Sequence, residues 1–258
     1  MKTKTYRSLT QWIAALFTIH YSLFTIVALS SVALTSAALC SCSSSDDDQP
    51  AKVPAAGKGT FTDPRDGQQY GYATYGGQDW MTENYRYDIS DDVNSTIYID
   101  ADENGSTNAG TNYGSTRNLA RFGRLYTLAG AKSACPDGWR LPTDDDWQRL
   151  EQALGMSADD AASEGWRGHI SRSMITVYND ITDLNLRLGG YFFLHDGVAG
   201  SWLFMGTYGY YWTATADTSK VGEFYYVRKL TYNRSEVCRL SMEPTSYKLS
   251  VRYVRDAR

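Results

Sequence analysis

The last third of the chain alternates apolar and polar side chains with a period of two. Aromatic or β-branched residues recur at alternate positions in residues 208–216, 222–233 and 247–256, and the leucines of residues 184–194 follow the same rhythm. Neighbouring side chains of a strand point to opposite faces of its sheet. The period therefore predicts four half-buried strands.

A hairpin is predicted earlier, in residues 70–81. Aromatic residues alternate there before Gly76 and Gly77, a pair that can take the positive φ angles of a two-residue hairpin turn. Residues 88–123 are instead rich in Asn, Gly, Ser and Thr and show little periodicity. We expect a long irregular region there, of a kind that is often functional or mobile.

Helical periodicity marks the middle of the chain. In residues 123–134, Leu125, Leu128, Ala129 and Lys132 recur with a period close to 3.6 and predict one apolar helix face.

A second helix is predicted in residues 141–155. Thr143 and Asp146 have the spacing of a capping box, and three consecutive aspartates fall in the first turn, where the helix dipole favours carboxylates. Trp147 begins the stripe that we expect to be buried. A shorter helix is predicted to start at Ser157.

Helices thus come early and antiparallel-looking strands late. This order predicts an α+β fold rather than an alternating α/β fold. We expect two or three helices packed on short antiparallel strands.

The N-terminus has the pattern of a bacterial lipoprotein leader. Lys2, Lys4 and Arg7 precede a long uncharged apolar run that ends in "LCSC", which resembles a lipobox with Cys42 as the acylated residue. Residues 1–41 are then a signal peptide, and a multiply acylated Cys42 gives stable membrane attachment. The run is also long enough to be an uncleaved transmembrane anchor.

Residues 42–59 are predicted to be a flexible tether, because they are rich in Ser, Asp, Pro, Ala and Gly and have no hydrophobic periodicity. The run "SSSDDD" directly after Cys42 resembles the lipoprotein export signal of Bacteroidota, which implies an outer-membrane anchor facing the extracellular side. A plain solvated acidic tether explains the same composition. One globular domain is expected in residues 60–258.

The net charge limits the classes of binding partner that we expect. The formal net charge of the whole chain is −4, and loss of the leader would make it more acidic. No dense basic patch is present, so we expect no nucleic-acid partner.

Two cysteines lie in the expected domain, Cys135 and Cys238. Outside the cytoplasm such a pair most often forms a disulfide, and two reduced, buried thiols are the alternative.

A calcium site is a further candidate. Asp100, Asp102 and Asn104, followed by Gly105, have the spacing with which a calcium loop begins, but Thr111 stands where the bidentate Glu belongs. Loops of this composition are common without a metal, so Ca²⁺ is only one of two interpretations.

The segment "GSWLFMGTYGYYW" provides candidate ligand-binding rings. Trp202, Tyr208 and Tyr210 are the residues that we expect to be exposed for stacking on a sugar or anchoring a protein. The alternative is that rings at alternate strand positions belong to the core.

Five ordered blocks of the chain resemble the Fibrobacter succinogenes major paralogous domain. They are residues 61–87, 123–150, 189–193, 209–216 and 249–256. The resemblance implies a secreted or surface domain with a C-type-lectin-like fold, similar also to formylglycine-generating enzyme. This family usually has a cysteine where the chain has Tyr253, which leaves Cys238 as the candidate partner of Cys135.

The segment 135–147, "CPDGWRLPTDDDW", has the density of special residues that often marks an active site. Each residue also has a structural role, in a turn, a helix cap or a buried ring, so we interpret it as a structural joint. No nucleophile elbow, P-loop or zinc-site spacing is present.

The sequence therefore predicts a non-enzymatic surface lipoprotein whose lectin-like domain binds an extracellular glycan or protein. A structural or assembly subunit of an envelope or fimbrial complex is the second hypothesis. An enzyme of the formylglycine-generating type is the third.

Overall fold

The computed structural model describes residues 53–99, 113–175, 182–195 and 199–258. The leader, Cys42 and most of the tether lie outside the described residues. Among the described helices, none is long and apolar enough to cross a membrane.

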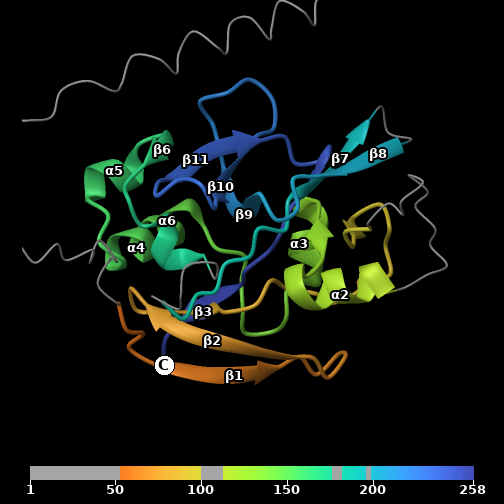
Figure 1. Cartoon of the computed structure of the whole chain (residues 1–258), viewed down its shortest axis with the longest axis horizontal. Coiled ribbons are helices and arrows are strands. Elements are labelled where there is room, and N and C mark those ends of the chain that lie inside the picture. The colour runs from red at the N-terminus through yellow and green to blue at the C-terminus, as the bar shows by residue number, and fades with distance from the viewer. Residues whose placement is uncertain (1–52, 100–112, 176–181, 196–198) are drawn as a thin grey trace, which may run out of the picture. The chain divides into compact units, whose positions relative to one another are not determined.

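The first sheet is antiparallel and lies along one side of the molecule (Figure 1). Its strands, in spatial order, are β1 (Lys58–Thr62), β2 (Gln69–Tyr75), β3 (Gln78–Met81) and β13 (Val254–Asp256). The hairpin prediction is confirmed, since Gly76 and Gly77 connect β2 to β3 at φ angles of 57° and 76°. The first strand starts two residues inside the segment expected to be a tether, and Val53 also packs against the core.

The region predicted to be irregular contains regular elements. They are β4 (Ser95–Thr96), α2 (Tyr113–Phe122) and, just after the region, β5 (Leu125–Tyr126). The two short strands pair with each other. The prediction for residues 88–123 is therefore wrong at its C-terminal end, where a ten-residue helix forms.

The first predicted helix is shorter than expected, because Thr127 caps it and the chain before the cap is extended. α3 spans Leu128–Ala134, and Thr127 Oγ1 accepts from the backbone N–H of Gly130 at 3.0 Å. Leu128 and Ala131 are buried, whereas Lys132 is exposed. The placement of Lys132 on the apolar face was therefore wrong.

The second predicted helix is confirmed. α4 spans Asp144–Ala153 and begins with a complete capping box between Thr143 and Asp146. Trp147 is fully buried. α5 (Ala158–Ala162) follows, capped by Ser157 as predicted.

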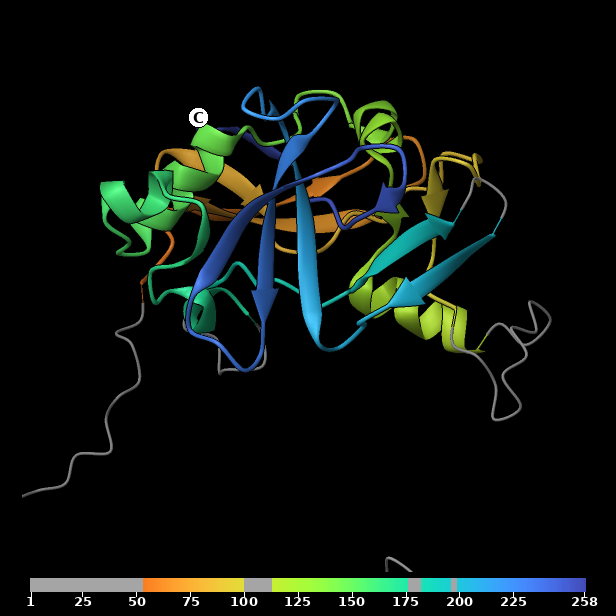
Figure 2. The ribbon, with the colours of Figure 1, turned by 90° about the horizontal axis from the view of Figure 1, so that it is seen from above.

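A second antiparallel sheet forms the centre of the molecule (Figure 2). Its strands, in spatial order, are β6 (Gly165–Arg167), β11 (Val237–Met242), β10 (Tyr225–Thr231) and β9 (Tyr208–Ala216). The strand predictions for residues 208–216 and 222–233 are confirmed.

A third, small sheet projects as a ribbon beside the central one (Figure 2). It contains β12 (Tyr247–Lys248), β7 (Tyr191–His195) and β8 (Ala199–Leu203). The remaining helix is α6 (Ser171–Met174).

Two strand predictions need correction. The alternating leucines 184, 186 and 188 are all buried, but the chain there forms only an isolated bridge between Ile175 and Leu186, and the strand starts at Tyr191. Residues 247–256 form two short strands rather than one. The mixture of antiparallel sheets and short helices is consistent with the predicted α+β class.

Helices cover the two faces of the central sheet. Tyr211, Leu230 and Val237 share one buried cluster with Trp147 of α4. Trp212 and Val227 share the other cluster with residues of α3.

Buried charges join α4 to the central sheet. Asp144 accepts from Arg228 Nη1 at 2.6 Å and from Arg239 Nη2 at 2.9 Å. Glu151, about two turns further along α4, accepts from Arg228 Nε at 2.7 Å and from Arg167 Nη2 at 2.8 Å. Since buried charges require partners, this network fixes the position of the helix on the sheet.

The segment 135–147 is part of the architecture. Trp139 is only 7% exposed and lies beneath the Arg255 guanidinium, 4.4 Å from the ring centroid. Arg140 exchanges two backbone hydrogen bonds of 2.9 Å with Val254 and pairs with Asp146. These contacts give the segment the structural role that its interpretation as a joint predicts.

Candidate functional site

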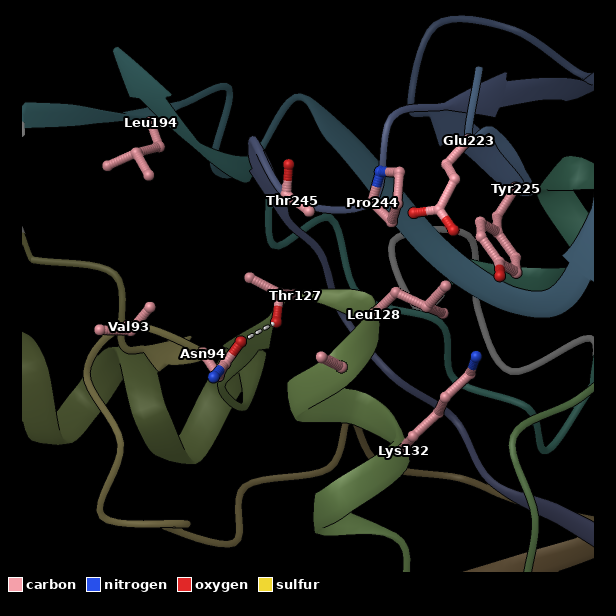
Figure 3. Close-up of a pocket in the computed structure, with 11 residues that line it drawn as sticks. Val93, Asn94, Thr127, Leu128, Lys132, Leu194, Glu223, Tyr225, Pro244 and Thr245 are labelled. Carbon is pink, nitrogen blue, oxygen red and sulfur yellow. Dashed lines mark hydrogen bonds between the residues drawn. The ribbon is translucent and has the colours of Figure 1, made fainter. Parts of the chain in front are cut away.

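A hollow of about 410 Å³ opens between α3 and the turn that follows β11 (Figure 3). Its size lies in the range of small-ligand sites, and its lining is mostly apolar, as such sites usually are. The lining residues come from five segments of the chain: Val93, Asn94, Thr127, Leu128, Ala129, Lys132, Leu194, Glu223, Tyr225, Pro244 and Thr245.

One wall of this pocket is held by a network around Asn94. Thr127 Oγ1 donates to Asn94 Oδ1 at 2.6 Å, and Thr127 N donates to the Asn94 carbonyl oxygen at 3.0 Å. Asn94 Nδ2 donates to Asp91 Oδ2 at 2.7 Å. Because Thr127 is also the N-cap of α3, the same side chain sets the start of the helix and the position of the wall.

Two further contacts fix the position of this wall. Lys248 Nζ donates to the carbonyl oxygen of Asp92 at 2.6 Å, and burial lowers the pKa of this lysine. Gly130 lets the wall approach α3, since a Cβ at this position would lie 2.3 Å from the Asn94 carbonyl oxygen. The pocket is therefore preorganised on this side.

Three polar side chains stand on the other side of the pocket (Figure 3). Lys132 Nζ lies 5.1 Å from the ring centroid of Tyr225, within the range of a cation–π contact. Glu223 follows on the chain segment that leads into β10 and is exposed. Within the described residues, neither Lys132 nor Glu223 has an ion-pair partner, so both charges are available to a ligand.

The pocket combines a few ionisable side chains with apolar ones. The pocket has one ammonium, one carboxylate and one phenol around an apolar floor. Such a set can bind a ligand with hydroxyl, amide or charged groups by hydrogen bonds and apolar contact.

The three rings predicted for ligand binding do not line this pocket. Tyr210 is 5% exposed and belongs to the core, so its prediction as an exposed ring was wrong. It points inward because β9 is covered on that face by α3 and β7. Trp202 and Tyr208 are half-buried. Trp202 packs edge-to-face on Phe192 at 5.0 Å.

The expected disulfide between Cys135 and Cys238 is not formed, and both thiols are free. The two thiols lie in different surroundings. Cys135 Sγ donates to the Trp139 carbonyl oxygen at 3.2 Å, while Cys238 lies on β11 opposite Lys229. Burial raises the pKa of Cys135 to about 11 and also raises that of Cys238. Both thiols therefore stay protonated at neutral pH, which disfavours nucleophilic chemistry.

The calcium candidates Asp100, Asp102 and Asn104 lie outside the described residues, as does the lipidation candidate Cys42. In the described part of the chain, no group of three or more His, Cys, Asp or Glu side chains is arranged to hold a metal ion.

Sequence reasoning missed the pocket residues. The helical period placed Lys132 on the apolar face of its helix. The alternation in residues 222–233 assigned Glu223 and Tyr225 only to a strand. The one usable signal was Thr127, a capping residue before Leu128, which predicts a later helix start and an exposed Lys132.

Comparison with known proteins gives one match. The model of the Fibrobacter succinogenes major domain matches residues 73–255. No curated protein and no solved structure matches. The match extends from β2 to β13 and includes every segment that lines the pocket.

Proposed function

The chain belongs to the Fibrobacter succinogenes major domain family, and from this premise we propose that it is a non-enzymatic binding module that holds an extracellular glycan or protein segment. The observation that carries the proposal is the pocket beside α3, with a fixed wall, an apolar floor and two unpaired opposite charges. Binding sites of this size rely on apolar contact for affinity and on a few polar groups for orientation.

The pocket suggests how a ligand would be oriented. Lys132 would receive an acceptor group of the ligand, and Glu223 a donor group, while Leu128 and Leu194 contact its apolar surface. A sugar or a short peptide segment presents such groups close together.

We further propose that the domain is lectin-like and is carried on the outer membrane by a lipid on Cys42. In support, the helices α3 and α4 pack on antiparallel strands, and the leader ends in the lipobox-like "LCSC" followed by "SSSDDD". A Bacteroidota source is part of the same proposal, because the acidic run resembles the export signal of that phylum.

A pocket-filling variant tests the binding proposal. The purified full chain is applied to an array of glycans and extracellular proteins, together with Ala129→Trp and Ala158→Trp. Ala129 is exposed and lines the pocket, so an indole there occupies the hollow without entering the core. Ala158 is equally exposed but lies on α5.

We expect ligands of the wild type to bind Ala158→Trp equally well and Ala129→Trp at least tenfold more weakly. Binding that is the same in both variants would show that the pocket is not the binding site.

The anchor is tested by metabolic labelling with palmitate. We expect Cys42→Ala to abolish the label and Cys40→Ala to retain it, and protease treatment of intact cells to degrade the domain. Label on Cys42→Ala, or full protection from protease, would contradict the anchor or its orientation.

A further inference from the structure

A row of four side chains crosses the central sheet away from the pocket. The strand registers pair Trp166 of β6 with Cys238 of β11, Cys238 with Lys229 of β10, and Lys229 with Tyr210 of β9. Because paired residues of neighbouring strands point to the same face, all four stand on one face of the sheet. With a strand spacing of about 4.8 Å, the row is roughly 14 Å long.

Lys229 is held at the centre of this row by aromatic rings. Its Nζ lies 4.4 Å from the centroid of Tyr208, 5.4 Å from that of Tyr210 and 5.5 Å from that of Trp166. The side chain is half-buried, and burial lowers its pKa. The rings fix the position of the ammonium before any ligand arrives.

The ammonium has no carboxylate partner within the described part of the chain. The next cation, Arg234, lies over the same indole, 4.9 Å from the Trp166 centroid, and its closest carboxylate oxygen, on Glu236, is 3.8 Å away. Two cations therefore share one ring in a chain whose overall charge is negative. An anionic group placed here would gain attraction from both.

Exposed aromatic surface continues the row on the β9 side. Phe204 is 46% exposed and packs against Tyr208 at 5.4 Å. Aromatic rings around a fixed positive charge can bind a ligand that carries both a carboxylate and an adjoining flat apolar face.

We propose that this face, made by Trp166, Tyr208, Lys229, Arg234 and Phe204, binds the carboxylate groups of an acidic polysaccharide. The carboxylate pairs with Lys229 and Arg234, and the carbon face of the sugar ring packs against Tyr208 and Phe204. An acidic peptide offers the carboxylates without the flat carbon faces, so the glycan is the occupant that uses both the charges and the rings.

The site is separate from the pocket of the proposed function, since none of its five residues lines that pocket. The two proposals can therefore fail independently: Ala129→Trp reports on the pocket, and changes at Lys229 report on the row.

Calorimetric titration of the full chain tests the proposal with two probes of the same backbone, polygalacturonate and its fully methyl-esterified form. We expect the acid to bind and the neutral ester to bind at least tenfold more weakly, because a charge-assisted contact is lost. Lys229→Met should weaken binding of the acid at least tenfold, and Lys229→Arg should retain most of it. Lys220→Met is the matched control, because Lys220 is a half-exposed lysine that lies near Asp217 instead, with 3.8 Å between Nζ and Oδ2.

Thermal unfolding of each variant separates loss of the site from loss of the fold, and Trp166→Ala provides a second change in the site. The proposal is overturned if the acid does not bind, if the ester binds as well as the acid, or if Lys229→Met matches Lys220→Met. Poly-glutamate that binds through Lys229 as tightly as polygalacturonate would overturn the assignment to a glycan.

Discussion

Asp144 has the sequence context of a catalytic acid, but its contacts are those of a structural ion pair. It lies in a run of three aspartates next to a tryptophan, and it receives hydrogen bonds from Arg228, Arg239 and Gln148. Burial raises the pKa of this carboxyl, but the arginine partners outweigh that effect and lower it overall. The carboxylate is therefore charged at neutral pH, and its arginine partners occupy its oxygens, as in a structural ion pair.

Asp144→Asn is expected to lower the free energy of unfolding by about 3–5 kcal/mol, because it leaves the guanidinium groups of Arg228 and Arg239 buried beside a neutral amide. Asp145→Asn, in the same turn of α4 but exposed, should change it by less than about 0.5 kcal/mol. Urea unfolding measures both. Equal effects at the two positions would contradict the network.

At the scale of elements, α3 and α4 have the same kind of start and different roles. Each begins at a threonine whose hydroxyl accepts from the third backbone N–H of the helix. In α4 the capping-box residue Asp146 also pairs with Arg140. In α3 the capping residue Thr127 also holds the pocket wall at Asn94. Local capping thus serves the core in one helix and the pocket wall in the other.

Thr143→Ala is expected to lower the free energy of unfolding by about 1 kcal/mol, because it removes the side-chain acceptor of the α4 capping box. Thr143→Ser keeps the hydroxyl and should stay within a few tenths of a kcal/mol of the wild type. Chemical denaturation of the wild type and the two variants measures these free energies of unfolding. An unchanged value for Thr143→Ala would show that the cap does not stabilise the fold.

Elements with strong local signals were predictable, and elements set by tertiary packing were not. The capping box of α4 and the aromatic alternation of β9 are both local, and both were predicted. The leucines from 184 to 188 alternate because they fill the core beside Trp147, without a neighbouring ladder, so the alternation was read as a strand. α2 is amphipathic, but it is rich in Gly, Ser, Thr and Asn, residues that favour turns, so its segment was interpreted as irregular.

The pocket could not be predicted because its walls meet only in three dimensions. Val93, Ala129, Leu194, Glu223 and Thr245 come from five separate segments, and no spacing in the sequence brings them together. The sequence predicted exposed rings at Trp202, Tyr208 and Tyr210, and this prediction is wrong for Tyr210. Tyr208 lies beside the Lys229 ammonium, but Tyr210 is core.

On the scale of the whole molecule, the buried ion-pair network lies apart from the two proposed binding sites. The buried ion pairs and the segment 135–147 join α4, the central sheet and β13. The pocket and the Lys229 row lie at other places on that framework. Changes at the framework should therefore alter stability, and changes at exposed positions of either site, such as Ala129, should mainly alter binding.

Acid should destabilise the whole molecule in a defined range. Burial raises the pKa of Asp63, but hydrogen bonds from Arg65 and Tyr85 outweigh it and lower the pKa from 3.8 to about 2. Hydrogen bonds from Ser219 and Ser241 lower the pKa of Asp217 to about 2 as well. A carboxyl with a lowered pKa in the folded state contributes stability that is fully present above about pH 4 and is lost as the pH falls through about 2.

We therefore expect the free energy of unfolding to fall steeply between pH 4 and pH 2. Asp63→Asn should be less stable than the wild type at pH 7 and should lose less stability over that range. Urea titrations at several pH values provide the measurement, and parallel profiles for the two proteins would contradict the role given to Asp63.

The central claim is that the pocket beside α3 is a binding site and that the segment 135–147 is architecture. The most direct test is an NMR titration of the isotope-labelled chain with the strongest ligand found on the array. We predict that the amide signals of Leu128, Ala129, Lys132 and Tyr225 shift as the ligand is added, while the indole N–H signal of Trp139 does not move. A Trp139 indole signal that shifts while the pocket amides stay in place would contradict the account.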